Sequence, residues 1–298
     1  MKNKVTLGVI FALVSTILYG LSPTVTKLAF QSGLTLSSLL FLRCTLALIL
    51  SLAACRVKGV SLKLGKTQAG WVIFIAAACF FTNVLQTEGY RYLSGMIAST
   101  VACTYIIFIL IIELIIGRVK ATPKKIGALI LTILGVGCIF VCGDIKGTNL
   151  YAFLLCLAGS LCAAFWYVPM NNESVKEVSE ESLMVYTLLP FTVYFGIEGL
   201  ISGEQLLATT PKQWLYALIL GVAILFVSRL IFYKAVRYIG ASKASMIDML
   251  EPFFSGVFGM ITLQEKIPFG VLAGTVITVI AIIISMDERD AKKKDAEK

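Results

Sequence analysis

The chain alternates between long apolar stretches and short polar segments. Each apolar stretch has about 20 residues, the length that one helix needs to cross the hydrocarbon core of a bilayer. The first stretch is too long for a signal peptide and lacks a clear small-residue cleavage site, so we count it as a helix. The pattern predicts ten transmembrane helices, at roughly 5–29, 37–55, 69–88, 95–116, 124–142, 149–169, 183–201, 213–233, 243–263 and 267–286.

The composition points to the same class of protein. Hydrophobic residues make up 58% of the 298 residues and charged residues only 14%, with a mean hydropathy of +0.90. A soluble domain carries about a quarter charged residues. The formal net charge of +9 lies at the ends of the apolar stretches and in the C-terminal tail, as in membrane proteins. We therefore expect the lipid bilayer as a partner, and no nucleic acid.

The distribution of lysine and arginine predicts the orientation. If the N-terminus is cytoplasmic, nineteen of these residues fall in cytoplasmic segments and five in external ones. The two remaining basic residues, Arg43 and Arg229, lie within predicted helices and are counted on neither side. Because cytoplasmic loops are enriched in basic residues, both termini are expected on the cytoplasmic side of the plasma membrane.

The two halves of the chain align without a gap when residue numbers are shifted by 146. Arg91-Tyr92 then falls on Arg237-Tyr238, and Ala98-Ser99 falls on Ala244-Ser245. Each half has five predicted helices, and an odd number turns the second half over in the membrane. The predicted fold is an all-α integral membrane protein of ten transmembrane helices in two inverted five-helix repeats, residues 5–142 and 149–286, with a polar tail at 287–298.

The segment from Ala235 to Glu265, AVRYIGASKASMIDMLEPFFSGVFGMITLQE, resembles the signature of EamA-type members of the drug/metabolite transporter superfamily. Earlier in the chain, Tyr19-Gly20 with Lys27 resembles the first-helix pattern of that family, and Phe41-Leu42-Arg43 resembles the second. The resemblance covers about residues 5–286. It implies a ten-helix inverted-repeat carrier, often an exporter of amino acids or other small metabolites.

The first half departs from this family pattern. Tyr105 stands at the position that matches Glu251, and Ile106 at the position that matches Pro252. Where the family has Gly-Glu, the first half has Gly117-Arg118. A site built by the ninth predicted helix is therefore better supported than one built by the fourth.

Two carboxylates interrupt the ninth apolar stretch. Asp248 and Glu251 are three residues apart and share a face of a helix, and Pro252 should bend that helix. Acidic residues are costly inside a bilayer and mark a functional site by default. They would bind a substrate amine or couple transport to protons. Because the chain has no histidine, proton coupling would need a carboxylate. The alternative is a structural ion pair between these acids and Arg229 in the preceding helix.

Polar and aromatic residues within the predicted helices are candidates for the wall of a substrate pocket. Arg229 falls on Asn83 under the shift of 146, and polar groups at matching positions suit a pocket at the repeat interface. Each aromatic side chain is otherwise a packing residue. The predicted substrate-binding residues are Tyr19, Asn83, Gln86, Tyr105, Trp166, Tyr186, Arg229, Tyr233, Asp248 and Glu251, and Tyr90, Thr104 and Tyr167 belong to the same predicted wall.

A second predicted group lies toward the external ends of the helices. Lys27, Arg43, Glu88 and Arg91 are expected to form a gate or vestibule there. The alternative for Lys27 and Arg91 is that they extend to the membrane interface. Three prolines, Pro23, Pro169 and Pro252, are the predicted hinges.

The sequence lacks the motifs that nucleotide-driven transport, catalysis or metal binding would need. The chain has no phosphate-binding loop and no histidine, and its eight cysteines form no CxxC pair. We expect no metal, no cofactor and no enzymatic activity.

The expected function is secondary transport of a small molecule by alternating access. The alternatives are a flippase for a lipid-linked or amphipathic molecule and a membrane scaffold without a cavity. Gly270 and Gly274 form a GxxxG motif, which favours packing within a monomer over a homodimer interface.

Overall fold

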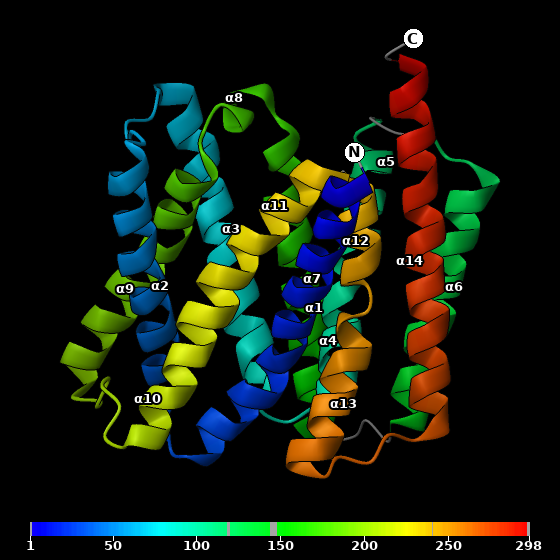
Figure 1. Ribbon diagram of the computed structural model, residues 1–298. Helices are drawn as coiled ribbons and strands as arrows, with labels where there is room; N and C mark the ends of the chain where they lie inside the picture. Colours follow the sequence, from blue (N-terminus) through cyan, green and yellow to red (C-terminus); the bar gives the residue numbers. More distant parts are fainter. Residues whose placement is uncertain (1, 118–119, 144–147, 240, 297–298) are drawn as a thin grey trace.

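The computed structural model describes residues 2–117, 120–143, 148–239 and 241–296, and the regular structure of this part of the chain is entirely helical (Figure 1). Nine of its helices are long and apolar enough to cross a membrane, and a shorter apolar segment runs from Phe269 to Ile284. The predicted all-helical membrane fold is therefore confirmed. In chain order the elements are α1 (Lys2–Gln31), α2 (Leu36–Lys58), α3 (Lys66–Tyr90), α4 (Gly95–Cys103), α5 (Tyr105–Ile115), α6 (Pro123–Cys142), α7 (Thr148–Tyr167), η1 (Val168–Asn171), α8 (Glu173–Lys176), α9 (Glu180–Ser202), α10 (Pro211–Leu218), η2 (Ile219–Ser228), α11 (Arg229–Ile239), α12 (Ala241–Asp248), α13 (Glu251–Leu263) and α14 (Phe269–Ala296).

Hydroxyl side chains fix where several helices begin. The side chains of Thr35, Ser94 and Thr122 accept hydrogen bonds from backbone N–H groups in the first turns of α2, α4 and α6. Such caps satisfy donors that have no partner within the helix. At the other end, α2 and α9 each stop at a glycine in the left-handed conformation, Gly59 (φ 64°) and Gly203 (φ 67°). The residues that begin and end these helices are thus encoded in the short loops, as N-cap hydroxyls and C-terminal glycines.

One helix in each half is broken near its middle, and the two breaks match. The first lies at Thr104, between α4 and α5, and the second at Met249–Leu250, between α12 and α13. The carbonyl oxygens of Thr104 and Leu250 each accept hydrogen bonds from the N–H groups three and four residues later, with closely similar lengths. The first break contains no proline, so Pro252 alone does not explain this shape. Backbone breaks at membrane depth occur where they line a cavity.

Helices of each half pack against helices of the other half. Helix α1 packs on α11 and α13 of the second half, and α7 packs in the corresponding way on α3 and α5 of the first. Three further close pairs join equivalent helices, α2 with α9, α6 with α14, and the two broken helices through α4 and α13. This pattern is unchanged when the halves are swapped, as a two-repeat fold requires. Both chain termini lie at the same end of the bundle, which we call the terminal end (Figure 1).

Glycines bring α6 and α14 into backbone contact. A Cβ atom on Gly274 would lie 2.7 Å from the carbonyl oxygen of Gly135, and one on Gly135 would lie 2.9 Å from that of Gly274. Gly270 packs in the same way against Cys142. The GxxxG motif therefore packs helices within one chain, as the sequence favoured.

Replacing Gly274 by Ala is expected to lower the free energy of unfolding by about 1–3 kcal/mol, because the new methyl group meets backbone atoms that cannot move aside. Thermal unfolding of the purified protein measures the effect. Gly127, also on α6, has no atom within 4 Å of its hypothetical Cβ. Gly127→Ala should leave stability unchanged or slightly raised, and an equal loss in both variants would contradict this packing.

The predicted hinges differ from one another. Pro252 lies in the first turn of α13, directly after the break, and Pro169 lies in the 3₁₀ turn η1 that follows α7. Pro23 lies inside α1, which continues through it without interruption. The sequence analysis did not predict the π-helical segment η2, which ends immediately before Arg229. Wider π turns of this kind occur often at functional sites.

Candidate functional site

A cavity of about 290 Å³ lies between the two halves, at the level of the two helix breaks. Three pairs of residues at matching positions of the two halves line it: Asn83 and Arg229, Ala102 and Asp248, Tyr105 and Glu251. The lining residues are Tyr19, Ser22, Arg43, Thr82, Asn83, Gln86, Thr87, Tyr90, Ala102, Cys103, Tyr105, Ala163, Trp166, Tyr167, Met170, Leu220, Ile224, Leu225, Arg229, Phe232, Tyr233, Asp248 and Glu251.

Asp248 and Glu251 flank the break between α12 and α13. Asp248 is the last residue of α12 and Glu251 the first of α13, and both side chains are half-buried. The hydroxyl of Thr16 lies 3.1 Å from Oδ1 of Asp248 and 2.9 Å from the carbonyl oxygen of Ala12, so its single proton serves one acceptor at a time. The two acids share one cavity, although the helix is interrupted between them.

Neither carboxylate is neutralised by an ion pair. Within the described part of the chain, no basic side chain lies within 4.0 Å of Asp248 or Glu251. The guanidinium of Arg229 instead lies over the ring of Trp166, 5.9 Å from its centroid. The predicted alternative, a structural pair between Arg229 and these acids, is absent from these residues.

Arg43 also faces this cavity, whereas the sequence placed it in an external gate. Its Nη2 atom donates to Oδ1 of Asn83 at 3.1 Å and to Oγ1 of Thr87 at 2.9 Å. The amide of Asn83 is oriented by its own bond to the carbonyl oxygen of Cys79. Because Arg43 points from α2 toward α3, it lies beside the cavity and away from the helix end.

Stacked aromatic rings form one wall. The ring centroids of Trp166 and Tyr167 lie 3.9 Å apart, and those of Tyr105 and Tyr167 lie 4.7 Å apart. The indole Nε1 of Trp166 is buried and donates to no described atom. This wall offers flat apolar surface together with an unused hydrogen-bond donor.

Tyr186 is the one predicted binding residue that the structure places elsewhere. Its hydroxyl donates to the carbonyl oxygen of Leu62 at the terminal end of α9. The ring lines a separate apolar groove of about 460 Å³ between α3 and α9. The face of α9 that carries Tyr186 therefore turns away from the cavity. Thr104, from the wider predicted wall, is buried at the helix break and is not among the lining residues.

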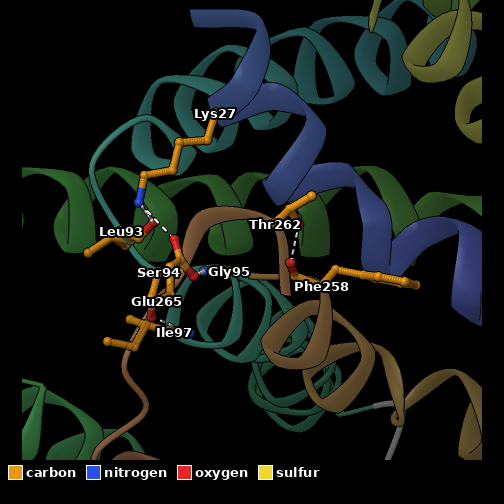
Figure 2. Close-up of polar contacts among 8 residues, drawn as sticks. All are labelled: Lys27, Leu93, Ser94, Gly95, Ile97, Phe258, Thr262 and Glu265. Carbon is orange, nitrogen blue, oxygen red and sulfur yellow. Dashed lines mark hydrogen bonds and ion pairs between the residues drawn. The ribbon is translucent and has the colours of Figure 1, made fainter. Parts of the chain in front are cut away.

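A compact polar cluster connects the two halves (Figure 2). It lies where α1 and α13 end, at the end of the bundle opposite the termini (Figure 1). Nζ of Lys27 on α1 lies 2.8 Å from Oε1 of Glu265, which follows α13, and 3.4 Å from the carbonyl oxygen of Leu93. Oε2 of Glu265 accepts the N–H of Gly95, the first residue of α4, at 2.9 Å. A carboxylate at a helix N-terminus is favourable. We call Lys27, Leu93, Gly95 and Glu265 the latch.

The other two predicted gate residues are not part of the latch. Arg91 lies 3.6 Å from Glu88, three residues earlier in the chain, and its guanidinium covers the ring of Phe30. Both belong to the same end of the bundle, at and just after the end of α3. Their contacts stay within the first half, whereas the latch spans the two halves.

Comparison with known proteins agrees with this architecture. The model of the EamA-like transporter family matches residues 6–141 and again residues 150–286. The chain belongs to the EamA-like transporter family. Curated relatives have transporter names. An uncharacterized transporter of Clostridium kluyveri is 24% identical over 98% of this chain and 96% of its own, and one of Archaeoglobus fulgidus is 26% identical over 91% and 95%.

A solved crystal structure of another protein shares the fold. It matches 93% of this EamA-like chain and 96% of its own with a TM-score of 0.66, at 13% sequence identity. Together these findings establish a multi-pass membrane protein of a transporter family.

Some residues in or beside the cavity of this EamA-like protein were not predicted from the sequence. Four short polar residues lie within apolar helices, where such residues usually serve only in packing: Thr16, Ser22, Thr82 and Thr87. The spacing of Asn83 and Thr87, one helical turn apart, is the one signal that was present. Glu265 entered the sequence analysis only as the last residue of the family signature. The sequence does not show which residues a side chain beyond a helix end will contact, so its bonds to Lys27 and Gly95 were not predicted.

Proposed function

We propose that this protein is a secondary transporter that exports small polar metabolites such as amino acids across the plasma membrane. Ten helices cross the membrane, in two inverted repeats at 5–142 and 149–286 with a polar tail at 287–298, and both termini are cytoplasmic. The observation that carries the proposal is the cavity between the halves. It contains two arginines and two carboxylates that form no ion pairs with one another among the described residues. Unpaired charges at membrane depth typically mark a substrate or ion pathway.

The terminal end is the cytoplasmic end on the strength of the lysine and arginine distribution. The lining of the cavity extends in that direction to Met170 in η1, just past α7, and to Phe232 and Tyr233, in the first half of α11. The latch lies in the other direction, one to two turns of α1 beyond Ser22. The arrangement suits a state that is closed to the outside and loads substrate from the cytoplasm.

In this proposal transport proceeds by alternating access. Inverted repeats let one arrangement of the halves open inward and the related arrangement open outward, around one site. The latch is the external gate, because its ion pair joins α1 to the end of α13. The matched breaks at Thr104 and Leu250 provide the points at which helices of each half change angle.

The apolar groove between α3 and α9 bears on the flippase alternative. A flippase needs a lateral opening together with a path for a polar head group. The groove is lined mainly by apolar side chains, among them Val72, Ile73, Phe80, Phe81 and Leu189. It shares no lining residue with the charged cavity. The groove therefore supplies no path for a head group, and the carrier is favoured. A scaffold would have a dry core in place of the cavity.

Counterflow in proteoliposomes tests the proposal. Purified protein is reconstituted into vesicles loaded with each of the twenty L-amino acids in turn, and uptake of the same radiolabelled amino acid is measured. We expect transient accumulation above empty vesicles for at least one amino acid. Failure of every amino acid, with correctly inserted protein, would reject amino acids as the substrate class.

A further inference from the structure

Arg43 is a buried cation whose neighbours are neutral. The residue is 5% exposed, and its two hydrogen bonds go to an amide oxygen and a hydroxyl. Its Nε atom is buried and has no hydrogen-bond partner among the described residues. No carboxylate of the described chain lies within 4.0 Å of the guanidinium. The positive charge is thus positioned but not neutralised.

Holding such a charge at membrane depth is costly. An unpaired buried ion loses its hydration without a compensating partner. The backbone around it is also rigid, because α2 packs tightly on η2 at this point. A Cβ on Gly221 would lie 2.7 Å from the carbonyl oxygen of Arg43. The backbone that carries Arg43 therefore has little room to shift, the two hydrogen bonds orient its guanidinium, and an anion that entered the cavity would relieve the cost.

A second unused donor lies in the same cavity. Nε1 of Trp166 is buried without a partner. The two orphaned buried atoms among the cavity-lining side chains are thus both N–H donors. A ligand that brings acceptor oxygens would satisfy this imbalance, and one that brings only donors would not.

The acids occupy the other half of the site. Asp248 and Glu251 belong to the second repeat, and their repeat mates in the first are Ala102 and Tyr105. Arg43 belongs to the first repeat and rests on Asn83, the mate of Arg229. The cavity thus holds Arg43 from the first repeat and two carboxylates from the second, where Arg229 is the other cation of the lining. A molecule that carries both a carboxylate and an amine could meet Arg43 with one group and the acids with the other.

We propose that Arg43 binds the carboxylate of the transported molecule, while Asp248 and Glu251 bind its amine. The ligand class is a small zwitterion, and Arg43 determines that a free carboxylate is required. Arg229, stacked on Trp166, is less available for this role. The inference rests on the proposed transport function, and its test is designed to separate the two.

The test compares acids with their uncharged isosteres. Binding to the purified full chain is measured by thermal shift and calorimetry for the twenty L-amino acids and for the amide of each one that binds. We expect the acid to bind about 10- to 100-fold more tightly than its amide, the range for a hydrogen bond to a charged group. In Arg43→Met the preference should fall to about one.

Two further variants keep the test decisive. Arg56→Met removes an exposed arginine from the last turn of the same helix and should retain the full preference. Arg43→Lys keeps the charge without the planar fork, so it should retain part of the preference, and it replaces Arg43→Met if that variant does not fold. An acid preference that is absent from the native protein, or that survives in the folded Arg43 variants, overturns the inference.

The outcomes distinguish this inference from the transport proposal. If no amino acid binds or exchanges, acetate and benzoate are compared with acetamide and benzamide on the same proteins. Binding of the carboxylates that depends on Arg43 would retain the anion site while amino-acid transport fails. No binding that depends on Arg43 would overturn the anion site. Amino-acid counterflow with equal binding of acid and amide would leave the transporter and remove this role of Arg43.

Discussion

Glu251→Gln and Asp248→Asn are each expected to lower the rate of counterflow about 10- to 100-fold. Each change keeps the shape of the side chain and removes its charge. A charge-assisted hydrogen bond to the substrate is worth about 1.5–3 kcal/mol, which corresponds to that range. Because neither acid takes part in an ion pair among the described residues, its removal leaves no buried cation newly unpaired. Initial rates at saturating and at limiting substrate separate a loss of binding from a loss of turnover.

Glu204→Gln is the matched control. Glu204 lies in the connection between α9 and α10, outside the cavity. This variant should retain native counterflow, and all three variants should insert and fold like the native protein. Native flux in both Glu251→Gln and Asp248→Asn would remove the carboxylates from the mechanism.

Breaking the latch is expected to open the end of the protein opposite the termini. The ion pair between Lys27 and Glu265 is largely buried, with side-chain exposures of 23% and 9%. Loss of one partner should shift the balance between closed and open states by about 1–3 kcal/mol, less than for a fully buried pair. This corresponds to a change of about 5- to 150-fold in their ratio. Glu265→Gln keeps an acceptor for the N–H of Gly95, so it isolates the contribution of the ion pair.

Spin labels at Gln31 and Thr262 report on this opening, since both are exposed and lie near the ends of the two helices that the latch joins. Glu265→Gln and Lys27→Met should both increase the population with a long distance between the labels. The double variant should add little, because each change breaks the same interaction. Lys58→Met breaks the other interhelical ion pair, between α2 and α9, and should leave the distance distribution unchanged. A shift in the control alone would contradict the gate.

The fold could be read from the sequence because membrane spans leave a strong signal. The run of apolar residues marks each helix, and matching pairs such as Arg91-Tyr92 and Arg237-Tyr238 reveal the duplicated plan. That plan also pairs Asn83 with Arg229, and both line the cavity. The other predicted cavity residues were identified from their polar or aromatic character within apolar helices.

The direction of individual side chains could not be predicted in the same way. Helices that are apolar on all sides do not reveal which face meets a neighbour. The prediction assigned Arg43 to a gate and Tyr186 to the pocket, whereas Arg43 lines the cavity and Tyr186 lines the groove between α3 and α9. The π-helical segment η2 carries no proline or other marker, so the rotation that it gives to the helix before Arg229 was invisible.

Accessibility of the cavity from each side tests the central claim most directly. In a background without the eight native cysteines, Ser22→Cys places one thiol on a half-buried position of the cavity lining. A membrane-impermeant thiol reagent is added from either side of oriented vesicles. We predict labelling from the cytoplasmic side in this background and a gain of labelling from the external side when Glu265→Gln is added. Labelling from neither side, or from one unchanged side in both proteins, would contradict a cavity that opens alternately between two inverted halves.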